Sequence, residues 1–299
     1  MNCLIIGAAG FIGRHLARAH HQRGDRVLAL DLEHRDPDDE LPFPIHHCDV
    51  VADPLHVPPG TDLVYYLAQF PQRRNFPDHA APLLAVNALG AVRAAEAALN
   101  ANVPAFLFAS TGTVYAPSFH PLPEDHPRRR DLPYAFTKVV AEDALNLFPN
   151  SINILSARFF GVFGPRQNAM LVHNVAQRVR AGEPVLIEPN PHAPQDLDGL
   201  RISLTFIDDL VRCLLALADR LSAREDLPPV LNVAGDEPVS IRRLAAEIGR
   251  VLGLHPSFDI APRPRRSDYI ADISRLTSLI NPRFTPFHHA LAKTLASYD

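Results

Sequence analysis

The sequence has few cysteines and no excess of positive charge. Its three cysteines, Cys3, Cys48 and Cys213, are scattered among 299 residues. An odd, scattered set predicts reduced, buried thiols and excludes a disulfide framework. Lysine and arginine number 29 against 33 aspartate and glutamate, so the net charge is −4. Because nucleic-acid-binding proteins usually carry a basic excess, we expect no nucleic-acid partner.

Long apolar runs and metal-ligand spacings are also missing. No apolar run approaches the roughly 18 residues that a membrane-spanning helix needs, so we expect no membrane partner. The first residues, MNCLII, lack a basic leader and a small-residue cleavage site, which predicts a cytoplasmic protein. Adjacent histidines such as His20 and His21 point apart on a helix, and neither Cys-x-x-Cys nor His-Glu-x-x-His occurs. We therefore expect no metal site.

What the sequence does contain is an alternation of short apolar runs with helical patterns. Such an alternation implies right-handed βαβ units and a parallel sheet that is covered on both faces. The expected fold class is therefore α/β, a Rossmann-type doubly wound parallel sheet. The predicted strands cover residues 2–7, 26–31, 45–48, 63–67, 105–110 and 152–158, and the predicted helices 11–23, 80–99 and 134–147.

The pattern loosens after Gly164-Pro165, where prolines gather in residues 184–194. We expect a Rossmann domain over residues 1–165, rejoined by about 202–220, and a smaller C-terminal α/β substrate lobe over 166–201 and 221–299. The predicted strands of this second half cover residues 202–207 and 231–234, and its helices 171–181, 208–218, 241–252, 274–280 and 287–297.

A glycine-rich segment, GAAGFIG over residues 7–13, follows the first predicted strand and opens the first predicted helix. Glycines there permit a tight turn and close approach of the backbone to a pyrophosphate, and the helix N-terminus attracts the phosphates. Asp31 ends the second predicted strand, 18 residues after Gly13, where a carboxylate can accept hydrogen bonds from the adenosine ribose. An acidic residue there disfavours a 2′-phosphate, so we expect NAD as cofactor. NADP remains an alternative, because Arg35 lies nearby in the sequence.

A Tyr-x-x-x-Lys motif, Tyr134 to Lys138, lies in a predicted helix, so the two side chains share one face. A free tyrosine has a pKa of about 10, and a neighbouring ammonium stabilises its phenolate. Tyr134 can then take a proton from a substrate hydroxyl while hydride leaves the same carbon. The segment STGTVY, residues 110–115, ends a predicted strand, where a hydroxyl can orient the substrate oxygen.

These motifs resemble the extended branch of the short-chain dehydrogenases/reductases, specifically the NAD-dependent epimerase/dehydratase family. The match extends through ARFFGVFGPR, residues 157–166, and through the spacing of Arg201 and Asp208. The resemblance implies that Thr111, Tyr134 and Lys138 are catalytic, with Ser110 as the second choice for the hydroxyl. The implied cofactor contacts are Gly7, Gly10, Phe11, Ile12, Gly13, Asp31, Asp49, Val50, Leu67, Ala68, Asn87, Ser110, Tyr134 and Lys138.

The resemblance also implies contacts to a nucleotide-sugar substrate. They come from Thr111, Gly112, Thr113, Arg166, Arg201 and an arginine taken here as Arg263, with Arg265 and Arg266 left open. The chain departs from the family pattern at Gly161, where many nucleotide-sugar epimerases have an asparagine that helps to bind the substrate diphosphate. Residues 184–200 form a longer, more proline-rich segment than the usual Gly-Asp-Gly turn.

The expected activity is that of an NAD-dependent epimerase, an isomerase of carbohydrate metabolism. In this reaction a sugar hydroxyl, which we expect to be that at C4, is oxidised transiently, and hydride then returns to either face of the sugar. Gly112 and Thr113 replace the Asp-Glu pair that dehydratases of the family use, which disfavours dehydration. An NAD(P)H-dependent ketosugar reductase and a non-catalytic NAD(P)-sensing protein are the alternatives. The family also implies a homodimer through the helices at residues 80–99 and 134–147.

Overall fold

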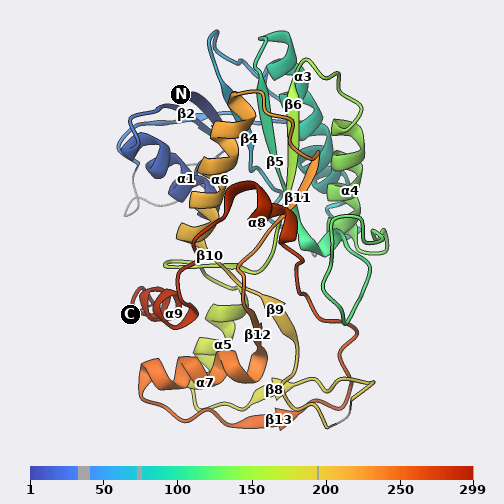
Figure 1. Ribbon diagram of the computed structural model, residues 1–299, viewed down its shortest axis with the longest axis vertical. Coiled ribbons are helices and arrows are strands. Elements are labelled where there is room, and N and C mark those ends of the chain that lie inside the picture. Colours follow the sequence, from blue (N-terminus) through green and yellow to red (C-terminus); the bar gives the residue numbers. More distant parts are fainter. Residues whose placement is uncertain (33–40, 73–75, 194, 299) are drawn as a thin grey trace. The chain divides into compact units, whose positions relative to one another are not determined.

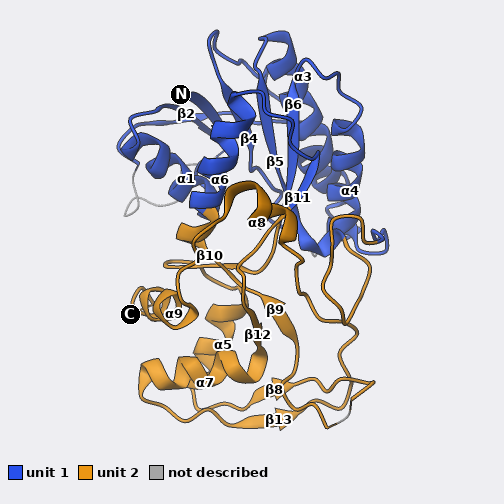
Figure 2. Ribbon diagram, viewed as in Figure 1, with its two compact units in different colours: residues 1–114, 127–158, 211–231 blue, residues 115–126, 159–210, 232–299 orange. Residues whose placement is uncertain are grey.

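A computed structural model of the protein describes residues 1–32, 41–72, 76–193 and 195–298 (Figure 1). The chain forms two compact units (Figure 2). Unit 1 comprises residues 1–114, 127–158 and 211–231, and unit 2 comprises residues 115–126, 159–210 and 232–299. The chain therefore passes between the units several times, whereas the sequence analysis places its boundaries near residues 165, 202 and 220.

The centre of unit 1 is a seven-stranded sheet with the order β11-β6-β5-β4-β1-β2-β3. The neighbouring pairs from β3 through β2, β1 and β4 to β5 are parallel. From β3 onward, the order 3-2-1-4-5-6 is that of a doubly wound sheet, so the expected Rossmann-type fold is confirmed. The strands are β1 (Asn2–Ile6), β2 (Arg26–Asp31), β3 (Ile45–His47), β4 (Leu63–Tyr66), β5 (Ala105–Thr111), β6 (Asn153–Phe159) and β11 (Val230–Val233).

Helices cover both faces of this sheet (Figure 1). On one face lie α1 (Phe11–Gln22) and α6 (Ile207–Ser222), and on the other α3 (Gly90–Asn100) and α4 (Pro133–Leu145). Successive strand residues point to opposite faces, which divides the sheet side chains between the two layers. The core beneath α3 and α4 includes Leu4, Ile6, Val64, Tyr66, Phe106, Phe108, Ala91, Ala94, Ala95, Ala98, Ala141 and Leu145.

The helix expected over residues 80–99 is broken into three parts. A π-helical turn, Ala85–Leu89, separates α2 (Ala80–Leu84) from α3. The hydroxyl of Tyr66 donates to the Val86 carbonyl at 2.5 Å, and a Cβ at Gly90 would lie 2.4 Å from that hydroxyl. The extra residue of a π turn leaves a backbone carbonyl for an outside donor, and the sequence periodicity carries no sign of it.

This same stretch corrects the expectation that no apolar segment approaches the length of a membrane-spanning helix. Among the described residues, the helical stretch Ala80–Asn100 is long and apolar enough to cross a membrane by length and composition. Arg93 and Glu96 interrupt its apolar residues, which is why it does not stand out as a continuous run. Since 44% of its apolar window is buried within the protein, core packing accounts for much of its apolar character.

Unit 2 combines four helices with short strand pairs among its described residues. Strands β7 and β10 pair in parallel, as do β8 and β13, while β9 and β12 are antiparallel. The strand expected over residues 202–207 is split in two, because its halves pair with different partners. The elements are β7 (Val162–Phe163), β8 (Val185–Ile187), β9 (Arg201–Ser203), β10 (Thr205–Phe206), β12 (Pro238–Ser240), β13 (Phe258–Ile260), α5 (Leu171–Arg180), α7 (Ile241–Leu252), α8 (Ser274–Ile280) and α9 (Phe287–Leu295).

Candidate active site

The glycine-rich segment forms the turn between β1 and α1. Gly7 has a φ of +93°, and a Cβ there would lie 2.6 Å from the backbone nitrogen of Ala68. A Cβ at Gly13 would lie 2.2 Å from the Gly7 carbonyl oxygen. Only glycine fits these two positions, because the turn packs against the backbone that follows β4 at Gly7 and against its own backbone at Gly13. The turn therefore presents bare backbone at the start of α1, as close approach to a pyrophosphate requires.

Asp31 lies at the carboxyl end of β2 and holds this turn in place. One carboxylate oxygen accepts the Ala9 N–H at 2.8 Å, and the other accepts the Leu32 N–H at 2.7 Å. The carboxylate retains lone pairs for ribose hydroxyls, so its placement agrees with the expected role. The contact with Ala9 was not expected from the sequence. Arg35, which kept NADP open, lies outside the described residues.

The segment after β3 carries Asp49 and Val50. The Asp49 carboxylate caps its own turn by accepting the Val51 N–H at 2.8 Å, and the Val50 side chain is buried. The guanidinium of Arg93, from α3, donates to the Val50 carbonyl at 2.8 Å and also to that of Val51. Sequence reasoning missed Arg93, although it fixes the segment expected to flank the adenine.

Asn87 lies in the π-helical turn and is fully buried. Its side-chain oxygen accepts the Phe70 N–H at 3.0 Å, and its nitrogen donates to the Thr137 hydroxyl at 3.1 Å. The Thr137 hydroxyl in turn donates to the Tyr134 carbonyl at 2.8 Å. Asn87 thus joins the segment after β4 to the first turn of α4, where Tyr134 begins the Tyr-x-x-x-Lys motif.

The candidate hydroxyls at the end of β5 have different surroundings. Ser110 is buried, and its hydroxyl donates to Glu142 at 2.5 Å. The Thr111 hydroxyl is partly exposed and lies 3.1 Å from that of Thr113, in the 3₁₀ turn Gly112–Val114. Ser110 is buried and bonded to a carboxylate, whereas Thr111 is partly exposed and bonded within its own turn, so Thr111 is the more accessible hydroxyl. This supports Thr111 as the first choice.

Tyr134 and Lys138 occupy the first two turns of α4. The Tyr134 hydroxyl donates to the side-chain oxygen of Gln69 at 2.9 Å. The Lys138 ammonium is buried, donates to the Ala109 carbonyl at 2.8 Å, and lies 4.6 Å from the centre of the Phe108 ring. Burial lowers the pKa of Lys138 to about 7, and the negative charge of Glu142 opposes this change.

A buried ion pair supports this end of unit 1. Glu142, one turn beyond Lys138, pairs with Arg158 of β6 at 2.6 Å, and each side chain is 2% exposed. The sequence analysis assigned no role to either residue, although Arg158 lies in the segment 157–166 that matches the family pattern. No local signal could have found them, since they lie 16 residues apart and such residue types are usually exposed.

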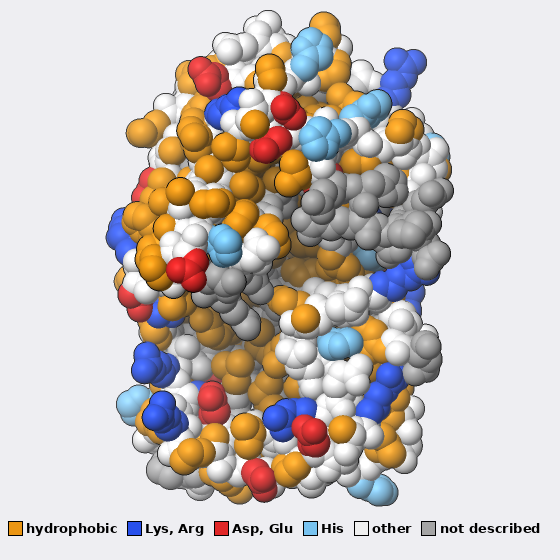
Figure 3. Space-filling view, turned by 180° about the vertical axis from the view of Figure 1, so that it is seen from behind, with side chains coloured by type: hydrophobic (Ala, Val, Ile, Leu, Met, Phe, Trp, Pro, Cys, Tyr) orange, Lys and Arg blue, Asp and Glu red, His pale blue; other side chains and the backbone are white. Residues whose placement is uncertain are grey.

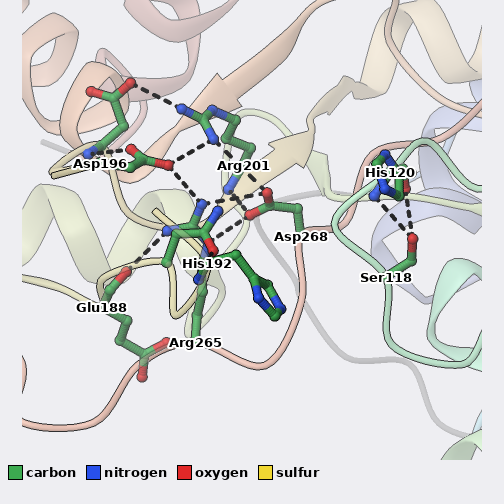
Figure 4. Close-up of polar contacts among 10 residues, drawn as sticks. Ser118, His120, Glu188, His192, Asp196, Arg201, Arg265 and Asp268 are labelled. Carbon is green, nitrogen blue, oxygen red and sulfur yellow. Dashed lines mark hydrogen bonds and ion pairs between the residues drawn. The ribbon is translucent and has the colours of Figure 1, made fainter. Parts of the chain in front are cut away.

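The candidate arginines of unit 2 are partly occupied by carboxylates (Figure 4). Arg201 donates to Asp196 at 2.9 Å and lies 3.4 Å from Asp198. Arg265 is buried and bonds to Asp268 at 2.8 Å and to the same Asp196 at 3.0 Å. Asp196 and Asp198 belong to the proline-rich segment 184–200, in which the chain departs from the family pattern, and a third carboxylate, that of Asp268, lies 4.0 Å from the Arg201 guanidinium.

The other candidate arginines of unit 2 lie apart from this cluster. Arg263 and Arg266 are exposed, so Arg265 is the arginine of this stretch that the structure brings to Arg201. Arg166 has a φ of +63°, and its N–H donates to the Ser297 hydroxyl at 2.9 Å. Gly161, with a φ of +43°, would place a Cβ 2.6 Å from the Ser203 carbonyl oxygen, so an asparagine there would be strained.

Comparison with known proteins adds an independent line of argument. The family model described as NAD dependent epimerase/dehydratase family matches residues 3–234. The uncharacterized UDP-glucose epimerase YtcB of Bacillus subtilis (strain 168) is 28% identical, over 94% of this chain and 92% of that protein. UDP-glucuronate 4-epimerase 6 of Arabidopsis thaliana is also 28% identical, over 90% of this chain and 64% of that protein.

A solved structure agrees with the sequence relatives. The structure of MoeE5 in complex with UDP-glucose and NAD is 26% identical, with a TM-score of 0.81 over 100% of this chain and 98% of that one. The similarity therefore extends over the whole chain and includes both units.

Proposed function

Since the chain belongs to the NAD-dependent epimerase/dehydratase family, we propose that it is an NAD-dependent 4-epimerase of a UDP-sugar. The observation that carries this proposal is the arrangement in unit 1. A glycine turn open to a pyrophosphate, a carboxylate at the end of β2 and a Tyr-Lys pair on α4 all belong to one sheet and its helices. The relatives supply the UDP-sugar class.

The residues of unit 1 suit a bound dinucleotide. Its pyrophosphate would lie on the turn at Gly7, Gly10 and Gly13, with Phe11 and Ile12 at the start of α1 and Asp31 at the ribose. NAD, when bound, supplies reversible hydride acceptance. The remaining proposed contacts are Asp49, Val50, Leu67, Ala68, Asn87, Ser110, Tyr134 and Lys138.

In the proposed reaction, Tyr134 accepts the proton of the sugar C4 hydroxyl as the C–H bond at the same carbon breaks, which leaves a ketone. Thr111 holds the oxygen, and Lys138 stabilises the phenolate form of Tyr134. The ketone then rotates within the site, and Tyr134 returns the proton as the C–H bond forms again on the opposite face of the sugar. Proton and hydride are both restored, so the reaction is a net isomerisation.

A ketosugar reductase would use the same residues once, with Tyr134 as proton donor and NAD(P)H consumed. Asp31 favours the epimerase, because a carboxylate at this position disfavours the phosphorylated cofactor that reductive reactions commonly use. A dehydratase is disfavoured because Gly112 and Thr113 offer no carboxyl group near Thr111. A non-catalytic NAD(P)-sensing role is disfavoured by the complete set of Thr111, Tyr134 and Lys138.

We expect the purified protein to retain NAD and to interconvert the C4 epimers of a UDP-sugar without added cofactor. The measurement is ¹H NMR of product mixtures from UDP-glucose, UDP-galactose, UDP-glucuronate and UDP-galacturonate, with mass spectrometry of the retained ligand. GDP- and dTDP-sugars serve as matched controls for the nucleotide. Net consumption of added NADPH would identify a reductase, and no turnover with any sugar would contradict both enzyme proposals.

Substrate contacts are proposed from the arginines of unit 2 and the loop after β5. Arginine suits a diphosphate because its guanidinium binds two oxygens at once. At Arg201 a diphosphate would have to compete with Asp196 and Asp198, which hold the guanidinium in this structure. The proposed contacts are Thr111, Gly112, Thr113, Arg166, Arg201 and Arg263, and Arg265 joins them through its shared carboxylate.

We also propose that the protein is a cytoplasmic homodimer and that its interface is formed by α4 and by the helical stretch 80–100, which comprises α2, the π-helical turn and α3. α3 and α4 pack against each other, and three exposed apolar side chains lie on these helices: Leu84 at the end of α2, Leu89 in the π-helical turn and Phe136 in α4. Figure 3 shows hydrophobic side chains gathered over this region, in the upper left of the view. An exposed apolar patch of this kind is typical of an association surface, and a second copy of the chain would cover it.

Replacing Leu89 by arginine is expected to convert the dimer to a monomer, because it places a charge at the centre of the apolar face. Light scattering after gel filtration should give twice 33.0 kDa for the unaltered protein and 33.0 kDa for the variant. Leu186→Arg is the matched control, since Leu186 is 52% exposed against 54% for Leu89 but lies in unit 2. A monomeric unaltered protein would contradict the dimer proposal.

A further inference from the structure

Glu142 lies on the same helix as the Tyr-x-x-x-Lys motif, and the motif does not account for it. Tyr134, Lys138 and Glu142 follow one another at intervals of four, so all three lie along one face of α4. Glu142 is buried, and an acidic side chain is rarely buried without a specific partner. Its partners come from two strands of the sheet.

The first partner is Ser110 at the end of β5. Its hydroxyl donates to one carboxylate oxygen of Glu142 at 2.5 Å. Lys138, one turn earlier on α4, donates to the carbonyl of Ala109 at 2.8 Å. Two residues one turn apart on the helix thus bond to two successive residues of the strand. This fixes how far along β5 the helix lies, and with it the place of Tyr134 relative to Thr111.

The second partner is Arg158 of β6. Its Nε donates to one carboxylate oxygen at 2.9 Å and its Nη2 to the other at 2.6 Å. Arg128, which is partly exposed, approaches the same carboxylate at 3.4 Å. A bidentate guanidinium pair offsets the cost of burying the carboxylate, so a negative charge can persist inside unit 1.

This negative charge lies one helical turn from Lys138, whose charged form is disfavoured by burial. Burial lowers the pKa of Lys138 to about 7, and Glu142 is the charged group that raises it. Without Glu142, a smaller fraction of Lys138 would be protonated at neutral pH. The other charged groups around this part of α4 are Arg158, Arg128, Arg130 and Asp143.

We propose that Glu142 is a positioning residue of the reaction: it sets the register of α4 on β5 through Ser110 and keeps the ammonium of Lys138 charged. This inference rests on the proposed roles of Tyr134 and Lys138. Glu142 itself touches neither the substrate nor the cofactor in this scheme. It acts through Lys138, whose charge stabilises the Tyr134 phenolate.

The test is a direct titration of Lys138. Lys138 and Lys293 are the two lysines of the sequence, so protein labelled with ¹³C at lysine Cε gives two resonances to follow against pH by NMR. In NAD-saturated protein, Glu142→Gln should lower the pKa of Lys138 by about one unit and leave that of the exposed Lys293 unchanged. Asp143→Asn is the matched control: it removes the same charge one residue away, at a solvent-exposed position, and should leave both lysines unchanged.

The pH profile of turnover provides a second readout, which a merely structural role would not move. The alkaline limb of kcat, where Lys138 loses its proton, should shift by about one pH unit towards acid in Glu142→Gln. Glu142→Asp keeps the charge beside Arg158 and should bring the alkaline limb most of the way back to its original position. Glu142→Asp also serves as the test variant should Glu142→Gln fold poorly, and an unchanged pKa of Lys138 is then expected.

An unchanged or raised pKa of Lys138 in folded Glu142→Gln would overturn the proposal, as would a shift of equal size in Asp143→Asn. The titration does not depend on the identity of the substrate. A lowered pKa of Lys138 in Glu142→Gln, together with no turnover of any UDP-sugar, would therefore overturn the proposed function and support the effect of Glu142 on the charge of Lys138.

Discussion

Replacing Tyr134 by phenylalanine is expected to lower kcat about 10³-fold, the scale of a general acid–base group, while leaving NAD bound and the fold intact. Phenylalanine keeps the ring but has no proton to give or take. The lost bond, from the hydroxyl to Gln69, joins side chains at the protein surface and contributes little to stability. Turnover with the UDP-sugar that proves active, together with the retained-ligand assay, measures both effects.

Tyr65→Phe is the matched control. Tyr65 is fully buried on the opposite face of β4, where its hydroxyl bonds to His20 at 2.9 Å. Removing this hydroxyl should cost about 1 kcal/mol in the free energy of unfolding and leave kcat within a few-fold. Activity of Tyr134→Phe within a few-fold of the unaltered enzyme would show that another group carries the proton.

Replacing Arg158 by methionine is expected to lower the free energy of unfolding by about 3–5 kcal/mol. The variant leaves the Glu142 carboxylate buried without its bidentate partner, and the remaining contacts, from the Ser110 hydroxyl and from the partly exposed Arg128 at 3.4 Å, do not offset the cost of burial. Urea denaturation followed by circular dichroism measures the loss. A loss below about 1 kcal/mol, the scale of an exposed ion pair, would show that the pair is solvated.

Removing both charges should restore most of that stability. Glu142→Leu combined with Arg158→Met places two apolar side chains where the pair was, and buried ion pairs are often replaced in this way at little cost. Arg128→Met is the control for charge alone, since Arg128 also pairs with Glu142 but is partly exposed, and it should cost under about 1 kcal/mol. A double variant as unstable as Arg158→Met alone would show that the loss of stability comes from disturbed packing and not from the unpaired carboxylate.

The sequence predicts the parts of the site whose signals are local. The GAAGFIG segment is recognised by its glycine spacing between a strand and a helix, and Asp31 follows it at the end of the next strand. The Tyr134–Lys138 spacing is fixed by a single helix. Continuous apolar runs mark buried parallel strands, so the six N-terminal strands and the helices that follow them were placed to within a few residues.

Features made by distant segments escaped the sequence analysis. Glu142 and Arg158 meet only after α4 packs on the face of the sheet, and each alone resembles a surface residue. The π turn accepts a hydrogen bond at Val86 from Tyr66 of β4, which lies 20 residues earlier. The choice of Arg265 rather than Arg263 beside Arg201 depends on the alternation of buried and exposed residues in an irregular segment.

Asp31 accepts the Ala9 N–H in addition to its proposed contact with the ribose, and this sets a condition on any attempt to redesign dinucleotide preference. The usual exchange replaces the acidic side chain by a small one, which makes room for an extra phosphate. Here that exchange would also remove the acceptor of the Ala9 amide and so loosen the phosphate-binding turn itself. A successful redesign therefore needs a replacement that still offers an oxygen to Ala9, such as asparagine, before any cation is added for the phosphate.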